Sequence, residues 1–175
     1  MSILDVSKDM MGQFSVFVRE IGDESNKTLR RVGGGMDSPP QSNIITDLGW
    51  KGFLVNGISY IYQFHNRCWV GTGTTEHTVE SVDLGNRIAY SAARRNSSGS
   101  STIEVDGVNY YRCRNEYLLS SSSIRGVPIS EIAVGRSAYN MYAGQLIKDE
   151  TGNPTTIILK DNEEMIVRYD ILFRK

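Results

Sequence analysis

The two histidines of the chain are the first residue types to consider for metal binding or proton transfer. His65 and His77 lie twelve residues apart, and Glu76 and Asp83 are the acidic groups near His77. A zinc site takes three or four ligands, commonly Cys and His at short regular spacings. No cysteine stands at such a spacing around either histidine. We therefore interpret both as polar loop residues and expect no metal ion.

Two glycine-rich stretches could in principle bind phosphate. The first, GTGTT at residues 71–75, follows an apolar run, but it lacks the third glycine of a dinucleotide-binding loop and no helix of adequate length follows it. The second, GGGMDSPPQ at residues 33–41, contains two prolines, which exclude the helix that a phosphate-binding loop requires. We interpret both as turns or loops and expect no cofactor.

Hydrolytic chemistry has little support in the sequence. Residues 120–123 are four serines, but a serine nucleophile needs a base, and neither histidine stands in a recognisable triad context. A polysaccharide depolymerase would need two carboxylates in a cleft. The acids lie mainly in predicted turns, as at residues 149–150 and 161–164. We therefore expect no catalytic residues.

Binding of a ligand by side chains on strands is an open alternative. In the run 108–117, Tyr110, Arg112, Arg114 and Glu116 alternate with Tyr111, Cys113, Asn115 and Tyr117. An Arg–Tyr face can hold a phosphate or a carboxylated sugar, although such a face is more often a solvated surface or a subunit interface. Aromatic side chains that could stack on a host sugar are Trp50, Trp69 and Tyr110.

Length, charge and hydropathy restrict the partners. The 175 residues include 19 basic and 20 acidic side chains, so the formal charge of -1 creates no field that would favour nucleic acid or an anionic membrane. No apolar run approaches the roughly 18 residues of a membrane-spanning helix, and the first residues lack the pattern of a signal peptide. We expect no direct membrane contact.

Short strands and turns account for most of the chain. Apolar residues alternate from Met165 to Phe173, which predicts a half-buried strand. We expect this strand to form a hairpin with residues 155–159 and a three-stranded meander with residues 143–148. Asn56-Gly57 and Asp106-Gly107 each stand between strand-like runs and predict two-residue hairpin turns. Further strands are expected at residues 14–21, 43–50, 68–70 and 87–95.

These elements predict an all-β fold, an antiparallel β-sandwich of jelly-roll-like or Ig-like type with an N-terminal arm. Residues 1–45 would form the arm, the first strand and the Gly/Pro-rich loop, and residues 46–175 would form the sandwich. Cys68 and Cys113 could pair in such a sandwich, but assembly in the cytoplasm favours two reduced thiols.

Four sequence pieces in a fixed order resemble a family of tailed-bacteriophage virion proteins, described as tail, tail-fibre or collar-region components. They are GTGTT at 71–75, SEIAVG at 130–135, QLIKDETGNPTT at 145–156 and the final strand at 163–174. The resemblance covers roughly residues 65–175, with Ala133 standing where the family more often has glycine. It implies a structural role in a virion and places Glu131 on a central strand. We expect backbone hydrogen bonds or an ion pair, with Arg136 or Arg168, to hold this glutamate.

The resulting hypothesis is a non-enzymatic virion structural protein, assembled in the bacterial host cytoplasm, that forms a symmetric homo-oligomer in the tail, neck or collar, or baseplate. Other partners would be phage tail, portal, neck or capsid proteins. The alternatives are a host carbohydrate- or receptor-binding module and a capsid decoration protein. The charge balance disfavours nucleic acid as a partner. The predicted interface residues are Met10, Met11, Phe14, Tyr139, Met141 and Tyr142, the last three in an apolar loop.

Overall fold

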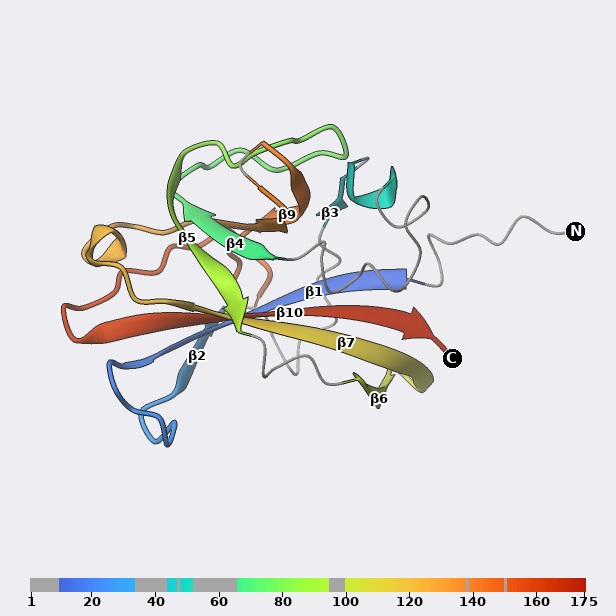
Figure 1. Cartoon of the computed structure of the whole chain (residues 1–175), viewed down its shortest axis with the longest axis horizontal. Coiled ribbons are helices and arrows are strands. Elements are labelled where there is room, and N and C mark those ends of the chain that lie inside the picture. The colour runs from blue at the N-terminus through green and yellow to red at the C-terminus, as the bar shows by residue number, and fades with distance from the viewer. Residues whose placement is uncertain are drawn as a thin grey trace, which may run out of the picture.

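The computed structural model of the chain describes residues 10–33, 44–46, 48–51, 66–94, 100–137, 139–149 and 151–175. These residues form two antiparallel β-sheets packed against each other, which confirms the predicted all-β sandwich (Figure 1). Among them no helix has the length and apolar character needed to cross a lipid bilayer. The predicted Asn56-Gly57 turn lies outside the described residues.

The first sheet is built on the two longest strands. β10 (Glu163–Arg174) pairs with β7 (Val108–Leu119) on one edge and with β1 (Met10–Glu20) on the other. β2 (Arg30–Gly33) adds to β1, and β6 (Ser100–Val105) adds to β7. The first and last described strands of the chain therefore lie side by side near the centre of one sheet (Figure 1).

The second sheet has the order β5, β4, β8, β9, β3. Its strands are β5 (Arg87–Arg94), β4 (Arg67–Gly71), β8 (Glu131–Gly135), β9 (Met141–Leu146) and β3 (Ile44–Ile45). β5 joins the layers, because its first residues pair with β4 while Ala93 and Arg94 pair with β7. A strand that changes sheet in this way forms a corner of the sandwich.

The core lies between the inner faces of the two sheets. From the first sheet it takes alternate residues of β1 and β10, among them Phe14, Val16 and Tyr169, and the Phe14 and Tyr169 rings lie 4.6 Å apart. β4 and β8 of the second sheet contribute Val70 and Ile132. The period-2 pattern of the sequence thus identifies the inward faces correctly.

The Asp106-Gly107 hairpin is confirmed. Asp106 has φ 50° and Gly107 has φ 76°, and two consecutive positive φ values are the mark of a type I′ turn, which matches the twist of the strands on either side. The turn sets the register of β6 against β7, in which Val105 pairs with Val108.

The predicted C-terminal hairpin and meander are wrong. Residues 155–159 form no strand with β10. The Thr155 N–H donates to the Ile147 carbonyl oxygen, so the chain does turn back toward 143–148, but Ile157 and Leu159 make isolated bridges with Ile129 and Arg125. β9, which covers most of 143–148, lies in the other sheet. The physical reason is that both edges of β10 are already taken by long strands, which offer more ladder hydrogen bonds than a five-residue run.

Two further expectations need correction. β10 is buried on both faces rather than half-buried, since Glu164 and Asp170 on its polar side are each only 4% exposed. Of the strand predicted at 43–50, the described residues form β3 and then a helical segment at 48–51.

Candidate functional site

The connection between β4 and β5 is a compact loop whose two ends touch. The Thr72 N–H donates to the Asn86 carbonyl oxygen over 3.0 Å, and the Asn86 side-chain amide donates to Thr72 Oγ1. A surface loop of this size with joined ends is an Ω-loop, a type that frequently carries function. We refer to residues 72–86 as the Ω-loop.

The carboxylate of Glu131 fastens the base of the Ω-loop. Glu131 begins β8 and has no exposed surface. Its Oε1 accepts hydrogen bonds from the Gly73 and Asn86 N–H groups, each at 2.8 Å, and its Oε2 accepts one from the Gly85 N–H at 2.9 Å. Hydrogen bonds to an ionised acceptor are stronger than neutral ones, so this single side chain holds both ends of the loop.

The glycines of the GTGTT stretch make this close approach possible. A Cβ atom on Gly73 would lie 2.5 and 2.6 Å from the two carboxylate oxygens of Glu131, and one on Gly71 would collide with Oε1. Any side chain at these positions would displace the buried carboxylate. The sequence interpretation as a glycine-supported turn is confirmed: Glu131 requires glycine at position 73, and Glu131 together with the Asn86 carbonyl oxygen requires it at position 71.

The expectation that backbone hydrogen bonds hold Glu131 is also confirmed, whereas the suggested partners are wrong. Arg168 pairs with Glu116 across two strands at 2.8 Å. The ionisable side chain beside Glu131 is instead that of His77, whose Nε2 lies 3.5 Å from Oε2. A single glutamate within the apolar sequence SEIAVG indicates a buried carboxylate. The partners of that carboxylate depend on the fold and could not be predicted from the sequence.

His77 lies in the Ω-loop, as expected, but it is buried rather than solvated. Burial lowers the pKa of its imidazole, and the negative charges of Glu131 and Glu76 offset this only in part. Its Nε2 has no hydrogen-bond partner. No group of three or more His, Cys, Asp or Glu side chains that could hold a metal ion occurs in the part of the chain that the structure describes. His65 lies outside that part.

The Ω-loop packs on the outer face of the second sheet. Leu84 of the loop joins Trp69, Ala133 and Met141 in a small apolar cluster. The Met141 N–H donates to the Val82 carbonyl oxygen over 3.0 Å, which ties the loop to the start of β9. The loop and the turn before β9 lie next to each other at the top of the view in Figure 1.

The outer side of this region exposes apolar side chains. Val79 is 50% exposed, Val82 53% and Tyr139, in the turn before β9, 69%. The Arg87 guanidinium lies 5.2 Å from the centre of the Tyr139 ring and also pairs with Asp83. We call Val79, Val82 and Tyr139 the apolar patch. Neither valine was predicted as an interface residue.

The predicted interface residues are distributed over the whole molecule. Tyr139 is exposed, whereas Met141 and Tyr142 are buried and belong to β9, so the predicted apolar loop at 139–142 is wrong. Phe14 lies in the core, Met11 is half-buried, and Met10 pairs with Phe173 as the first residue of β1. The alternation of apolar residues along a strand does not predict whether an aromatic side chain at a turn points into the core or into solvent.

Of the two arginines considered for ligand binding, Arg114 has a structural partner. Arg114 forms a two-pronged ion pair with Asp170 at 2.7 and 2.6 Å, which raises the pKa of Arg114. Burial lowers the pKa of Arg112, and the charge of Arg114 acts in the same direction. Trp69 and Tyr110, two of the aromatic side chains considered for sugar binding, are buried.

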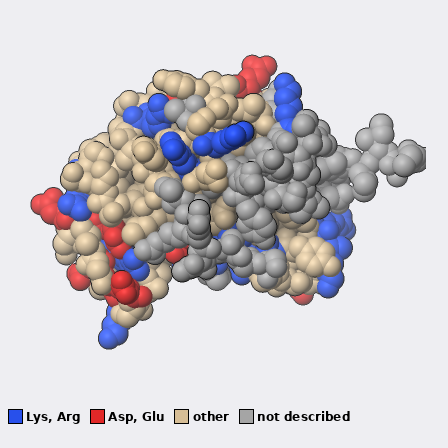
Figure 2. All heavy atoms as spheres, viewed as in Figure 1, with Lys and Arg blue, Asp and Glu red and all other residues tan. Residues whose placement is uncertain are grey.

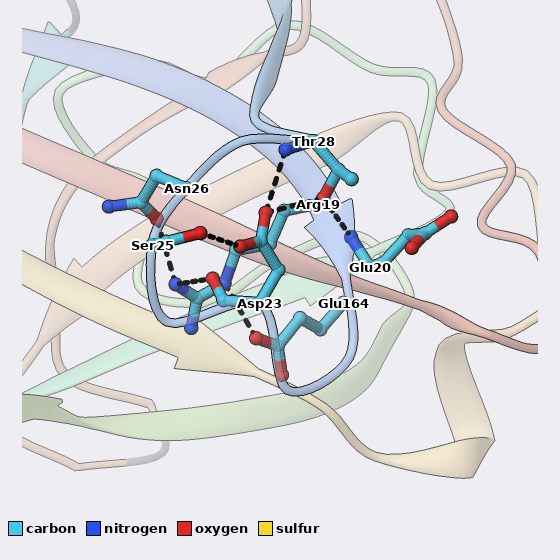
Figure 3. A network of polar contacts seen from close by, with 7 residues as sticks. All are labelled: Arg19, Glu20, Asp23, Ser25, Asn26, Thr28 and Glu164. Atoms are coloured by element: carbon cyan, nitrogen blue, oxygen red, sulfur yellow. Dashed lines mark hydrogen bonds and ion pairs between the residues drawn. The ribbon is translucent and has the colours of Figure 1, made fainter.

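A second polar network organises the turn between β1 and β2 (Figure 3). Asp23 accepts hydrogen bonds from Ser25 Oγ and from the N–H and Oγ1 of Thr28, which hold the pKa of Asp23 far below its usual range. Arg19 Nη1 donates to the Asp23 carbonyl oxygen and Asn26 Oδ1, while its Nε pairs with Glu164 at 2.7 Å. The turn is thereby anchored to β10.

This network also corrects the interpretation of residues 161–164 as turn acids. Glu163 and Glu164 begin β10 and are buried. Burial tends to raise the pKa of Glu163, but the Lys160 N–H and the Arg30 guanidinium more than offset it, and the pKa lies below its usual value. Figure 2 shows side chains of both charges interspersed at the end of the molecule that carries this turn.

Comparison with protein-family models, with curated proteins and with solved structures found no match. The role of the site is therefore inferred from its geometry alone. A carboxylate with no exposed surface and three amide donors cannot reach a substrate, so Glu131 is a clamp. The Ω-loop exposes polar side chains together with Val79 and Val82, and Tyr139 is exposed on the adjoining turn.

Proposed function

We propose that this chain is a non-enzymatic structural protein of a tailed-bacteriophage virion that assembles as a symmetric oligomer in the tail, neck or collar, or baseplate. The observation that carries the proposal is the exposure of Val79 and Val82 on a loop whose base is clamped by Glu131, with the exposed Tyr139 on the adjoining turn. A clamped loop with exposed apolar side chains suits a permanent protein contact, because little conformational freedom is lost on binding.

The distribution of ionisable groups supports the same proposal. General acid–base catalysis needs a group within hydrogen-bond reach of the reacting atoms. The buried carboxylates described above are engaged by partners: Glu131 by amides, Glu164 by Arg19 and Asp170 by Arg114. These hydrogen bonds and ion pairs stabilise the folded structure. The virion part of the proposal is supported by the resemblance to tailed-bacteriophage virion proteins, which depends on the order of the GTGTT, SEIAVG and QLIKDETGNPTT stretches.

The test is to locate the chain in particles. Virions purified from a culture that produces this chain would be labelled with an antibody against it and viewed by electron microscopy, with mass spectrometry of the same particles. The expected result is label at one vertex, the neck or the tail. Label spread over the capsid would favour a decoration protein. Particles that lack the chain by both measurements would overturn the proposal.

A further inference from the structure

The middle of the Ω-loop has one buried side chain, and that side chain is ionisable. Among residues 74–82, all of which the structure describes, only His77 is buried, with 6% of its surface exposed. Val79 and Val82 lie in the same segment but are exposed, so they add little apolar burial. We call residues 74–82 the mid-loop. Its position against the second sheet therefore depends largely on the burial of an imidazole, a group that titrates near neutral pH.

The two ends of the Ω-loop are anchored independently of His77. The N–H groups of Gly73, Gly85 and Asn86 all donate to the Glu131 carboxylate. Leu84 is buried in the apolar cluster on the outer face of the sheet. The mid-loop lies between these fixed points. It can therefore leave the sheet as a local opening, without separating β4 from β5.

The remaining contacts of the mid-loop are few. The Val82 carbonyl oxygen accepts one hydrogen bond, from the Met141 N–H. The Glu76 carboxylate lies 3.3 Å from Lys148 Nζ, and both side chains are partly exposed. An ion pair that solvent reaches stabilises a structure only slightly. Once His77 leaves its buried position, little else holds the mid-loop to the sheet.

The surroundings of His77 suit the neutral ring and not the protonated one. Nε2 is buried and has no hydrogen-bond partner. Glu131 Oε2 lies 3.5 Å from it and already accepts the Gly85 N–H. Gly144 of β9 packs against the ring, since a Cβ there would lie 3.3 Å from Cδ2 of His77. An imidazolium has two N–H donors, and a buried donor without an acceptor is unfavourable.

The ionisable groups around His77 act in opposite directions. The negative charges of Glu131 on β8 and Glu76 in the mid-loop favour the imidazolium, and Lys148 partly neutralises Glu76. Burial outweighs both carboxylates, so the pKa of His77 lies below its usual value. Burial raises the pKa of Tyr142 on β9, so that phenol stays neutral in acid. The closed loop therefore favours the neutral imidazole.

We propose that the mid-loop is an acid-released segment: protonation of His77 frees residues 74–82 from the second sheet, while Glu131 keeps both ends of the Ω-loop in place. The imidazolium regains its hydration when it leaves the sheet. The closed form is fully favoured above about pH 6.5, the ordinary value for histidine, and the released form increases as the pH falls below it. This inference goes beyond the proposed function and does not depend on it.

The test is native-state amide hydrogen exchange of the full chain, expressed as protection factors so that the intrinsic effect of pH on exchange cancels. The Met141 amide, which is bonded to Val82, reports on the mid-loop. Between pH 7.5 and 5 its protection should fall by at least about threefold and at most about 30-fold, the limit for one histidine with an ordinary pKa in the released form. The amides of Gly73, Gly85 and Asn86 should keep their protection, as should the β1–β10 ladder.

Two variants identify the titrating group. His77→Gln is neutral throughout this range, so the protection of the Met141 amide should no longer depend on pH. The comparison uses the dependence on pH and not the absolute protection, so it remains valid if the substitution also destabilises the loop. Glu80→Gln, at an exposed position of the mid-loop, is the matched control. It should retain the dependence of the wild type.

The contradicting outcomes are distinct. A Met141 protection factor that is independent of pH in the wild type, or that changes equally in His77→Gln, would overturn the proposal. An equal fall in the β1–β10 ladder would also overturn it, because the whole sandwich would then respond to acid. An equal fall at Gly73, Gly85 and Asn86 would refute the fixed ends. These results come from the purified chain, so they are separate from the labelling of particles that tests the proposed function.

Discussion

Arg19 and Glu164 face each other across β1 and β10 as an ion pair of 2.7 Å, with 6% and 5% of their side chains exposed. The remaining donors of Arg19 hold the Asp23 carbonyl and Asn26, so one guanidinium joins the first strand, its turn and the last strand. Removing one partner of a buried pair leaves the other charged and desolvated.

We therefore expect Arg19→Met to lower the free energy of unfolding by about 3–5 kcal/mol in urea titrations. The double variant Arg19→Met/Glu164→Leu should recover most of this loss, since neither charge remains buried. The more exposed pair Glu76–Lys148 provides the comparison. Glu76→Gln should cost less than about 1 kcal/mol, and an equal cost at both pairs would contradict the role given to burial.

Gly73→Ala tests the close approach of Glu131 to the GTGTT stretch. The added Cβ would meet both carboxylate oxygens, so the carboxylate must shift and give up amide hydrogen bonds. We expect a loss of about 2–3 kcal/mol in the free energy of unfolding. Thr74→Ala, at the exposed neighbouring position, should change it by less than about 0.5 kcal/mol. Similar values for the two variants would refute the clamp.

Glu131→Gln tests the clamp from the other side. One carboxylate oxygen becomes an NH₂ group that faces backbone N–H donors, so at least one bond is replaced by repulsion. We expect a destabilisation of about 3 kcal/mol and faster hydrogen exchange at the amides of Gly73, Gly85 and Asn86. Glu80→Gln on the exposed part of the Ω-loop is the control. Unchanged exchange at all three amides would argue against Glu131 as their acceptor.

The buried imidazole of His77 should make stability depend on pH. Because the folded state lowers the pKa of His77 below its ordinary value of 6.5, the unfolded chain takes up the proton first as the pH falls. The contribution is therefore fully present above about pH 6.5 and is lost on acidification, with a slope of at most about 1.4 kcal/mol per pH unit. Urea titrations of wild type and His77→Gln between pH 7.5 and 5 should show a smaller slope in the variant. Equal slopes would show that His77 does not titrate on unfolding.

The local sequence pattern predicts where strands form, but it does not predict which strands pair with each other. The alternation in residues 165–173 and the Asp106-Gly107 turn predict β10 and the β6–β7 hairpin, because both signals arise within a few residues. The partner of β10 is decided by competition between distant segments. Residues 155–159 are nearest in sequence, but β1 offers an eleven-residue ladder and the Arg19–Glu164 pair.

The candidate site shows the same division. Glu131 could be recognised as a lone acid among apolar residues, and Gly71 and Gly73 as a tight turn. That the two belong together depends on β4 pairing with β8, where Gly71 stands opposite Glu131. Val79 and Val82 carry no sequence signal at all, since isolated valines in a polar loop are common. Their exposure follows from the fold, which ties the Val82 carbonyl oxygen to the start of β9.

The pairing of β1 with β10 has a consequence for synthesis on the ribosome. Met10 pairs with Phe173, so the centre of the first sheet cannot close until nearly all of the described chain has been made. Until then β1, with Phe14, Val16 and Val18 on its inner face, has only β2 as a partner, and its other edge is open. Sheets that depend on such distant contacts fold slowly. The nascent chain therefore passes through a period in which an apolar strand edge is available to other nascent chains, and concentration during expression should affect the yield of correctly folded protein.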